Sequence, residues 1–280
     1  MPEQKLICYT VDLEHDYAGL SSSDKYEAFS HREDLDRLAD IVRRFELKLT
    51  VFATGKVLTQ RKETVKFFQD LGAEIELHGY HHIMYQPDVA LEIKKGMEAY
   101  RKYFGKNPMG YRSPGGVISP ILLKTLASEG IQYDSSLVPS FRWRVYKNLK
   151  SPIQPFYHPE APIFELPIGV VPKIRLPIAA SYIRLLGLST YKLLFGLFGT
   201  HSPLVYLFHL VDLIPTEMLK RLSLFWRCVY TKGQKKGVEV FEASVRYFKN
   251  MGYKPEFMSN LHKRYSQMPG SLLEKNHFSE

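Results

Sequence analysis

Lys5-Leu6-Ile7-Cys8-Tyr9-Thr10-Val11 is a short apolar run rich in β-branched side chains, and acidic residues follow it at once. Its length and composition predict a buried strand. Because side chains alternate across a strand, Asp12 and Glu14 would lie on one face and Leu13 on the other. Two carboxylates at one strand end can share a site, although an acidic turn before the loop Ser21–Ser23 would give the same pattern.

Apolar strands and amphipathic helices alternate along the rest of the chain. Further strands are predicted at Leu47–Phe52, Ala73–Leu77, Met109–Arg112, Ile131–Asp134, Pro203–His209 and Gly252–Met258. Helices are predicted at Arg32–Phe45, Glu63–Leu71, Asp88–Phe104, Ser119–Glu129, Glu217–Tyr230 and Val238–Met251. This order is typical of βα units around a parallel sheet, so the sequence predicts an α/β protein whose site lies at the carboxyl ends of its strands.

A histidine cluster follows the third predicted strand in the stretch Glu76-Leu77-His78-Gly79-Tyr80-His81-His82. His78 and His82 stand four positions apart, which on one turn of helix would place both rings on the same face. Neutral imidazole is the commonest ligand for borderline metals such as zinc. The pair is therefore a candidate metal site, with a solvated or packed histidine cluster as the alternative.

Three further strands end in polar groups, namely Arg112, Asp134 and His209. A divalent metal held by two histidines and one carboxylate keeps open positions for water and substrate. A second carboxylate could deprotonate that water, and a distant histidine could protonate a leaving amine. Together the strand-end groups predict hydrolysis of an amide or an ester.

The composition describes an ordinary folded protein and excludes several classes. The 280 residues are 45% hydrophobic and 24% charged, which argues against wholesale disorder. The formal net charge of +9 favours contact with anions, but no zinc finger, RNA-binding aromatic signature or recognition helix predicts nucleic acid as a partner. The two cysteines, Cys8 and Cys228, are expected to be buried thiols in a reducing compartment, which predicts a cytoplasmic protein.

The region between the fifth strand and Pro203 breaks the pattern. Residues 139–175 are rich in proline and arginine and are predicted to form a long loop containing one strand, Ile163–Val171. Residues 176–198 are the most apolar part of the chain, but prolines, glycines and charges interrupt them. We expect amphipathic helices there, which either face the core or rest on the inner face of a membrane or on a lipid-linked substrate.

At this point the sequence resembles the polysaccharide deacetylases of the NodB-homology group, carbohydrate esterase family four, in a variant with an Asp-x-Glu opening motif. Four motifs occur in the family's order along residues 5–260: His78-Gly-Tyr-His-His82, Arg112-Ser-Pro114, Asp134-Ser-Ser136 and Leu207-Phe-His209. The resemblance implies a distorted (β/α) barrel of about seven strands, one fewer than a complete barrel, with a helical apolar insertion at about residues 139–200. It also implies a single domain over residues 1–265, followed by a tail at 266–280.

The resemblance further implies the role of each site residue. Asp12 would be the general base, and Glu14 would bind the metal, expected to be zinc, with His78 and His82; Asp16 remains the alternative carboxylate ligand. Arg112 would orient Asp12, and the backbone N–H of Gly115 would help to bind the oxyanion. His209 would be the general acid, with Asp134 holding its ring.

The expected reaction is removal of an N-acetyl or similar N-acyl group from a saccharide, which could be lipid-linked. Two alternatives stay open: hydrolysis of a small amide or formamido sugar at the same site, and saccharide binding without turnover.

Overall fold

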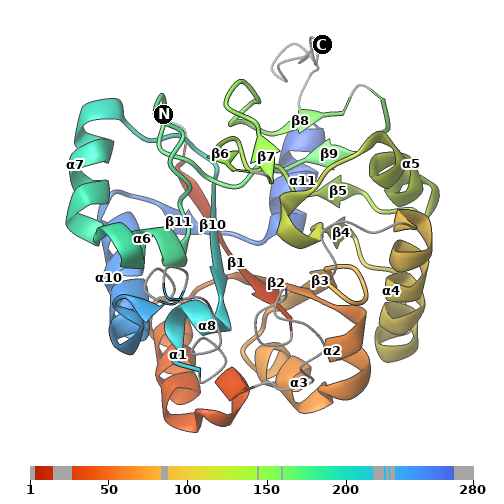
Figure 1. Ribbon diagram of the computed structural model, residues 1–280, viewed down its shortest axis with the longest axis horizontal. Coiled ribbons are helices and arrows are strands. Elements are labelled where there is room, and N and C mark those ends of the chain that lie inside the picture. The colour runs from red at the N-terminus through yellow and green to blue at the C-terminus, as the bar shows by residue number, and fades with distance from the viewer. Residues whose placement is uncertain are drawn as a thin grey trace.

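The core of the protein is one curled sheet, seen here in a computed structural model that describes residues 4–14, 27–82, 88–143, 145–158, 160–216, 224, 227 and 231–267 (Figure 1). Seven strands run parallel in the order β10-β1-β2-β3-β4-β5-β9, β8 pairs antiparallel with β9, and β11 pairs with β1. Their bounds are β1 Leu6–Leu13, β2 Leu49–Ala53, β3 Glu74–Leu77, β4 Gly110–Tyr111, β5 Tyr133–Asp134, β8 Phe156–Tyr157, β9 Phe164–Glu165, β10 Leu204–His209 and β11 Lys254–Pro255. The predicted distorted (β/α) barrel is confirmed.

Helices surround the sheet, as the pattern of βα units requires (Figure 1). Their bounds are α1 Arg32–Arg44, α2 Gly55–Gln60, α3 Lys62–Asp70, α4 Val89–Phe104, α5 Pro120–Ser128, α6 Ala180–Leu186, α7 Leu188–Phe198, α8 Leu210–Leu213, α10 Gly237–Asn250 and α11 Met258–Ser266. Short 3-10 turns cover Glu27–Ser30, Pro114–Gly116 and Gln234–Lys236, and a separate hairpin joins β6 Phe141–Arg142 to β7 Tyr146–Lys147.

Strand β1 is the centre of the core. All its residues are buried, because neighbouring strands flank it on both sides and packed side chains cover both faces. On the helix side Tyr9 contacts the rings of Tyr206 and Phe241, at centroid distances of 5.5 and 6.0 Å. In the register of the sheet, Asp12 lies beside His209 of β10 on one side and beside Phe52 of β2 on the other. The fold therefore brings residues from the first and the last third of the chain together at the carboxyl edge of the sheet.

Most predicted elements are confirmed within a few residues, including their caps. The side chain of Asp88 accepts a hydrogen bond from the Leu91 N–H at 2.9 Å, and Ser119 accepts one from the Leu122 N–H at 3.2 Å. Most of the helix predicted at Glu217–Tyr230 and the thiol of Cys228 lie outside the described residues.

Two predicted strands are shorter in the structure than expected, and some of the observed elements were not predicted. The strand expected at Ile163–Val171 contracts to β9, because only Phe164 and Glu165 pair with both neighbouring strands. The expected strand Gly252–Met258 contracts to β11, and α11 follows it, since Met258 and Leu261 have the spacing of a buried helix face. Helix α2 was not expected; it begins where Thr54 accepts a hydrogen bond from the Val57 N–H.

The apolar segment forms two amphipathic helices, α6 and α7, separated at Gly187, whose φ of 88° suits a residue without a side chain. One face packs inward through Ile183, Tyr191 and Phe195, as one of the two expectations required. None of the helices in the described parts of the chain is long and apolar enough to cross a bilayer.

Candidate active site

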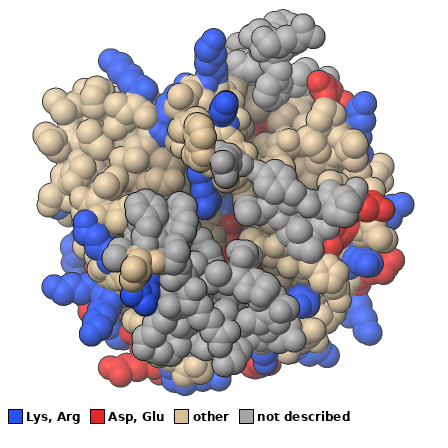
Figure 2. Space-filling view, in the orientation of Figure 1, with Lys and Arg blue, Asp and Glu red and all other residues tan. Residues whose placement is uncertain are grey.

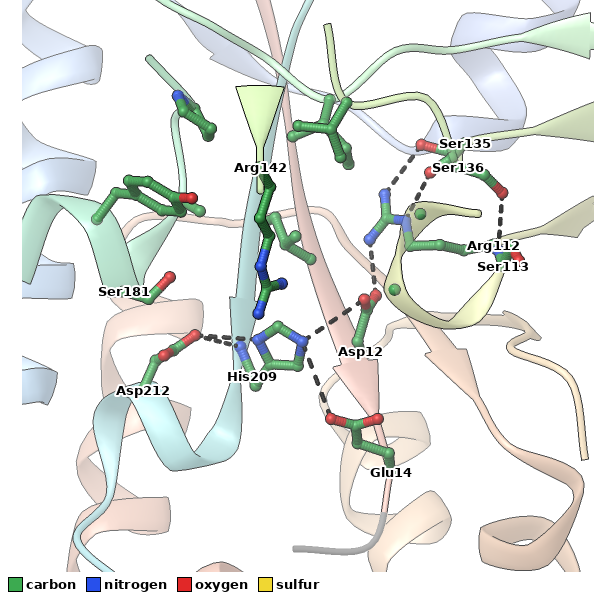
Figure 3. A pocket seen from close by; sticks show the side chains of 18 of the residues that line it. Asp12, Glu14, Arg112, Ser113, Ser135, Ser136, Arg142, Ser181, His209 and Asp212 are labelled. Atoms are coloured by element: carbon green, nitrogen blue, oxygen red, sulfur yellow. Dashed lines mark hydrogen bonds and ion pairs between the residues drawn. The ribbon is translucent and has the colours of Figure 1, made fainter. Parts of the chain in front are cut away.

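The polar groups predicted from strand ends meet at the carboxyl edge of the sheet. Asp12 and Glu14 come from the end of β1, and His209 ends the neighbouring strand β10 (Figure 3). The loop after β3 supplies His78 and His82, and the loop after β4 supplies Arg112. Leu13 points away into the core, so strand alternation places the two carboxylates on one face as expected.

Glu14, His78 and His82 form a compact cluster that could hold a metal ion, with their ligand atoms all within 4.8 Å of one another. Nδ1 of His78 lies 2.7 Å from the backbone carbonyl of Arg112, so this nitrogen donates and Nε2 presents its lone pair to the cluster. That Nε2 is buried and has no hydrogen-bond partner among the described residues. An orphaned imidazole lone pair beside carboxylates fits a divalent cation.

The electrostatics of His78 support the same interpretation. Burial lowers the pKa of His78 to about 4, despite the attraction of Asp12. The ring is therefore neutral at physiological pH, which is the form that coordinates a metal. The carboxylate of Glu14 contacts Nε2 of His82. Burial raises the pKa of Glu14, but His82, His209 and His78 together outweigh it and lower the pKa from its ordinary value.

The predicted helical spacing of His78 and His82 is wrong, although the two rings do lie together. They do not lie on a helix: the chain turns after β3 through Gly79 (φ 69°) and His82 (φ 60°), and the turn brings the rings to a centroid distance of 4.9 Å. His81, in the same motif, turns toward Glu92, with Nδ1 3.0 Å from its carboxylate. Asp16, the alternative ligand, lies outside the described residues.

Asp12 is held by Arg112, as the resemblance implied. Nη1 of Arg112 donates to Asp12 at 2.8 Å and to the Thr10 hydroxyl at 2.9 Å, while Nε and Nη2 bond Ser135 at 2.8 and 2.9 Å. Burial raises the pKa of Asp12, but Arg112, His78 and His209 outweigh it and lower the pKa to about 2. Asp12 is therefore a fixed and ionised carboxylate beside the cluster.

His209 lies across the pocket from Arg112, with Nε2 3.8 Å from Asp12 and 3.9 Å from Glu14 (Figure 3). Its other nitrogen, Nδ1, is 3.1 Å from the carboxylate of Asp212, which also accepts the His209 backbone N–H at 2.9 Å. Burial lowers the pKa of His209, yet the hydrogen bond and charge of Asp212 raise it to about 9. A ring that is protonated at neutral pH suits a proton donor.

Asp134 does not lie against His209, so the placement expected for it is wrong, and Asp212 stands there instead. Asp134 accepts from the Ser136 hydroxyl at 2.5 Å and shares a buried cluster with His158 and Glu165, whose ligand atoms lie within 4.8 Å of one another. Burial and the neighbouring Glu165 raise its pKa. Asp212 was missed because it lies beyond the strand end, at the third residue of α8; the capping-box spacing from His209 is the signal that could have found it.

The pocket at this edge of the sheet has a volume of about 340 Å³ and is lined by Asp12, Glu14, His82, Arg112 and His209. Gly115 and Gly116 form one wall with φ angles of 67° and 70°, and a Cβ at Gly116 would come within 3.0 Å of the Ser136 carbonyl oxygen. Arg142 of the hairpin points into the pocket from one side (Figure 3), and Tyr182 and Leu185 of α6 line another. The pocket thus joins a polar floor to a partly apolar wall.

Comparison with known proteins supports the resemblance. Residues 14–133 match the family model described as polysaccharide deacetylase. None of the curated proteins matches the sequence. Among solved structures, a Mycobacterium smegmatis protein provisionally named polysaccharide deacetylase is 18% identical with a TM-score of 0.64, over 100% of this chain and 96% of that chain.

Two other solved structures share the fold. The Puue allantoinase is 14% identical with a TM-score of 0.60, over 96% of this chain and 93% of that chain. A CE4 family pseudoenzyme from Bacillus anthracis is 12% identical with a TM-score of 0.55, over 94% of this chain and 66% of that chain. Residues 14–133 therefore contain a match to the polysaccharide deacetylase family, and these solved structures show that the whole chain has the fold of such proteins.

Proposed function

We propose that this protein is a metal-dependent hydrolase that removes an N-acetyl or similar N-acyl group from a saccharide. The observation that carries the proposal is the convergence of Glu14, His78 and His82 on one point, beside the ionised Asp12 and opposite the protonated His209. A divalent ion held by those three side chains, zinc in our proposal, would supply Lewis acidity toward the acyl carbonyl and the attacking water.

The chain's own residues complete the reaction. Asp12 accepts the proton of the attacking water, and Arg112 keeps this carboxylate ionised and pointing into the pocket. The N–H of Gly115, on the glycine wall, stabilises the negative charge that develops on the acyl oxygen. His209 donates its proton to the nitrogen of the leaving amine, and Asp212 holds the ring so that Nε2 faces the reacting atoms.

The residues of the pocket walls indicate the class of substrate. Arg142 and the apolar side chains of α6 suit a sugar attached to a charged and partly apolar group, so we extend the proposal to a lipid-linked saccharide. The buried free thiol of Cys8 is consistent with the proposed cytoplasmic location.

A second candidate uses the same site on a small cyclic amide or a formamido sugar. A solved allantoinase has the same fold, and this likeness favours the second candidate. The Bacillus anthracis pseudoenzyme shows that the fold also occurs without activity. In this chain the base, the acid and the candidate ligand set are all present, which supports turnover.

The test combines metal content with a substrate panel. Purified protein is analysed for bound metal and incubated with N-acetylated oligosaccharides, N-acetylglucosamine 1-phosphate, a formamido sugar and allantoin. We expect acyl release that EDTA abolishes and that Asp12→Asn and His209→Ala reduce by about a thousandfold or more. Activity that persists in both variants would reject the proposed roles.

A matched pair of variants isolates the metal site. His82→Ala should lose bound metal, whereas His81→Ala, in the same motif but turned toward Glu92, should retain it. Equal metal content in the two variants would contradict the proposed ligand set. Ring opening of allantoin or deformylation of the formamido sugar, without deacetylation of the saccharides, would favour the second candidate.

A further inference from the structure

We infer that the surface around the pocket mouth docks onto an anionic lipid bilayer. In the described parts of the chain, eleven large apolar side chains are exposed, and eight of them lie between residues 141 and 197. We define the rim face by six of these: Trp143, Leu149, Ile174, Leu186, Leu193 and Leu197. Trp143 is 71% exposed, and Leu193 and Leu197 are 63% and 64% exposed. Exposed apolar side chains are therefore concentrated in this part of the chain, although their contact with water is unfavourable.

The segments that carry the rim face contact one another. Nη1 of Arg175 donates to the Ser151 carbonyl at 2.8 Å, which joins the loop of Ile174 to the loop of Leu149. The Tyr191 hydroxyl donates to the Pro177 carbonyl at 2.5 Å, which joins α7 to the same region. These hydrogen bonds hold the segments of Leu149, Ile174 and α7 beside one another.

Two residues of the rim face, Trp143 and Leu186, adjoin the lining of the pocket. Arg142 and Tyr146 of the hairpin line one wall of the cavity, and Tyr182 and Leu185 of α6 line another. The exposed Trp143 follows Arg142 directly, and the exposed Leu186 follows Leu185. A partner that covered Trp143 and Leu186 would therefore lie beside the pocket.

The charge of this region identifies the partner's chemistry. Residues 166–211 contain no Asp or Glu, in a chain that has 29 acidic residues. Exposed lysines stand next to the exposed apolar side chains: Lys150 beside Leu149, Lys173 beside Ile174, and Lys192 beside Leu193. Figure 2 shows tan and blue surface without red over α6 and α7 at the upper left.

Aliphatic and tryptophan side chains interleaved with lysines, with no carboxylates over residues 166–211, suit the interface of an anionic membrane. The aliphatic groups reach the acyl boundary while the ammonium groups meet lipid phosphates. Nucleic acid would be matched by the lysines but not by exposed leucines. The inference deepens the proposed function. Membrane docking does not depend on that function, but one consequence does: a saccharide anchored in the bilayer would enter the pocket from the lipid side.

Vesicle binding tests the inference without any turnover. The protein is mixed with phosphatidylcholine vesicles, with and without phosphatidylglycerol, and the bound fraction is measured by flotation. We expect binding to the anionic vesicles at least about tenfold stronger than to the neutral ones, and weaker at high salt. Absence of binding to anionic vesicles would overturn the inference.

A charge-matched pair of double variants separates the rim face from a general effect of charge. Leu193→Glu with Leu197→Glu should weaken binding at least about tenfold. Leu91→Glu with Ile121→Glu adds the same charge at exposed positions of α4 and α5, across the molecule, and should bind like the wild type within about twofold. Equal loss in both, or wild-type binding in the first, would refute the rim face.

The Asp12→Asn variant distinguishes the two proposals. It should lose hydrolysis yet bind vesicles like the wild type, because Asp12 lies on the pocket floor and not on the rim face. Weakened vesicle binding in this variant would count against the rim face. Vesicle binding without hydrolysis of any substrate in the panel would refute only the proposed function.

Discussion

Replacing Asp212 by Asn should expose how strongly this carboxylate controls His209. The substitution keeps an oxygen that can accept the His209 backbone N–H, now 2.9 Å away, so the start of α8 is preserved. It removes the negative charge 3.1 Å from Nδ1. The imidazolium loses its charge-assisted partner while the shape of the pocket stays the same.

Two magnitudes follow from this geometry. A hydrogen bond to a charged group contributes about 1.5–3 kcal/mol, so kcat/KM should fall roughly 10- to 150-fold if the bond acts fully in the transition state. The pKa of His209, raised to about 9 mainly by Asp212 against the effect of burial, should drop by about one unit or more. Since the protonated ring is the proton donor, activity is lost above its pKa, and the alkaline limb should move to lower pH.

The assay is a pH profile of kcat/KM on whichever N-acyl substrate the wild type accepts, for the wild type, Asp212→Asn and Asp134→Asn. Asp134 lies in a separate buried cluster with His158 and Glu165 and does not contact His209, so Asp134→Asn should leave the alkaline limb in place. An unmoved limb in Asp212→Asn, with a shifted limb in Asp134→Asn, would refute the reasoning and return the role to Asp134.

Other substitutions test the scaffold around the site. Arg112→Met should lower the free energy of unfolding, measured in urea, by about 3–5 kcal/mol, since it leaves Asp12 buried and unpaired. Adding Asp12→Asn should recover part of this loss. If the effects of the two substitutions on the free energy of unfolding were simply additive, the ion pair between Arg112 and Asp12 would be contradicted. Burial raises the pKa of Glu76 to about 8, so its folded state stays protonated where the unfolded chain is ionised, and stability should fall by about 1.4 kcal/mol per unit as pH rises from its ordinary pKa toward that value. Glu76→Gln should flatten this dependence in urea titrations, and an unchanged slope would disprove the assignment. Gly110→Ala should destabilise by about 1–3 kcal/mol or more, because a Cβ would lie 2.1 Å from the Tyr133 ring; a melting temperature equal to that of the wild type would contradict the contact.

The order of apolar and polar residues is enough to predict the architecture and most of the site. Alternation along β1 puts Asp12 and Glu14 on one face, and parallel strands carry His78, Arg112 and His209 to the same edge. These are local rules applied strand by strand, so they need no knowledge of the neighbours. The structure confirms the sheet and brings these groups together.

Which carboxylate reaches His209 was decided only by the folded chain. Asp134 ends β5, and four strands separate β5 from β10 in the sheet, whereas Asp212 is brought back onto the ring by the turn into α8. The buried cluster of Asp134 with His158 and Glu165 joins β5, β9 and the segment after β8, which share no sequence pattern. Contacts of this kind depend on turns and on packing between distant segments, and such geometry is set by the whole core rather than by the periodicity of any one stretch.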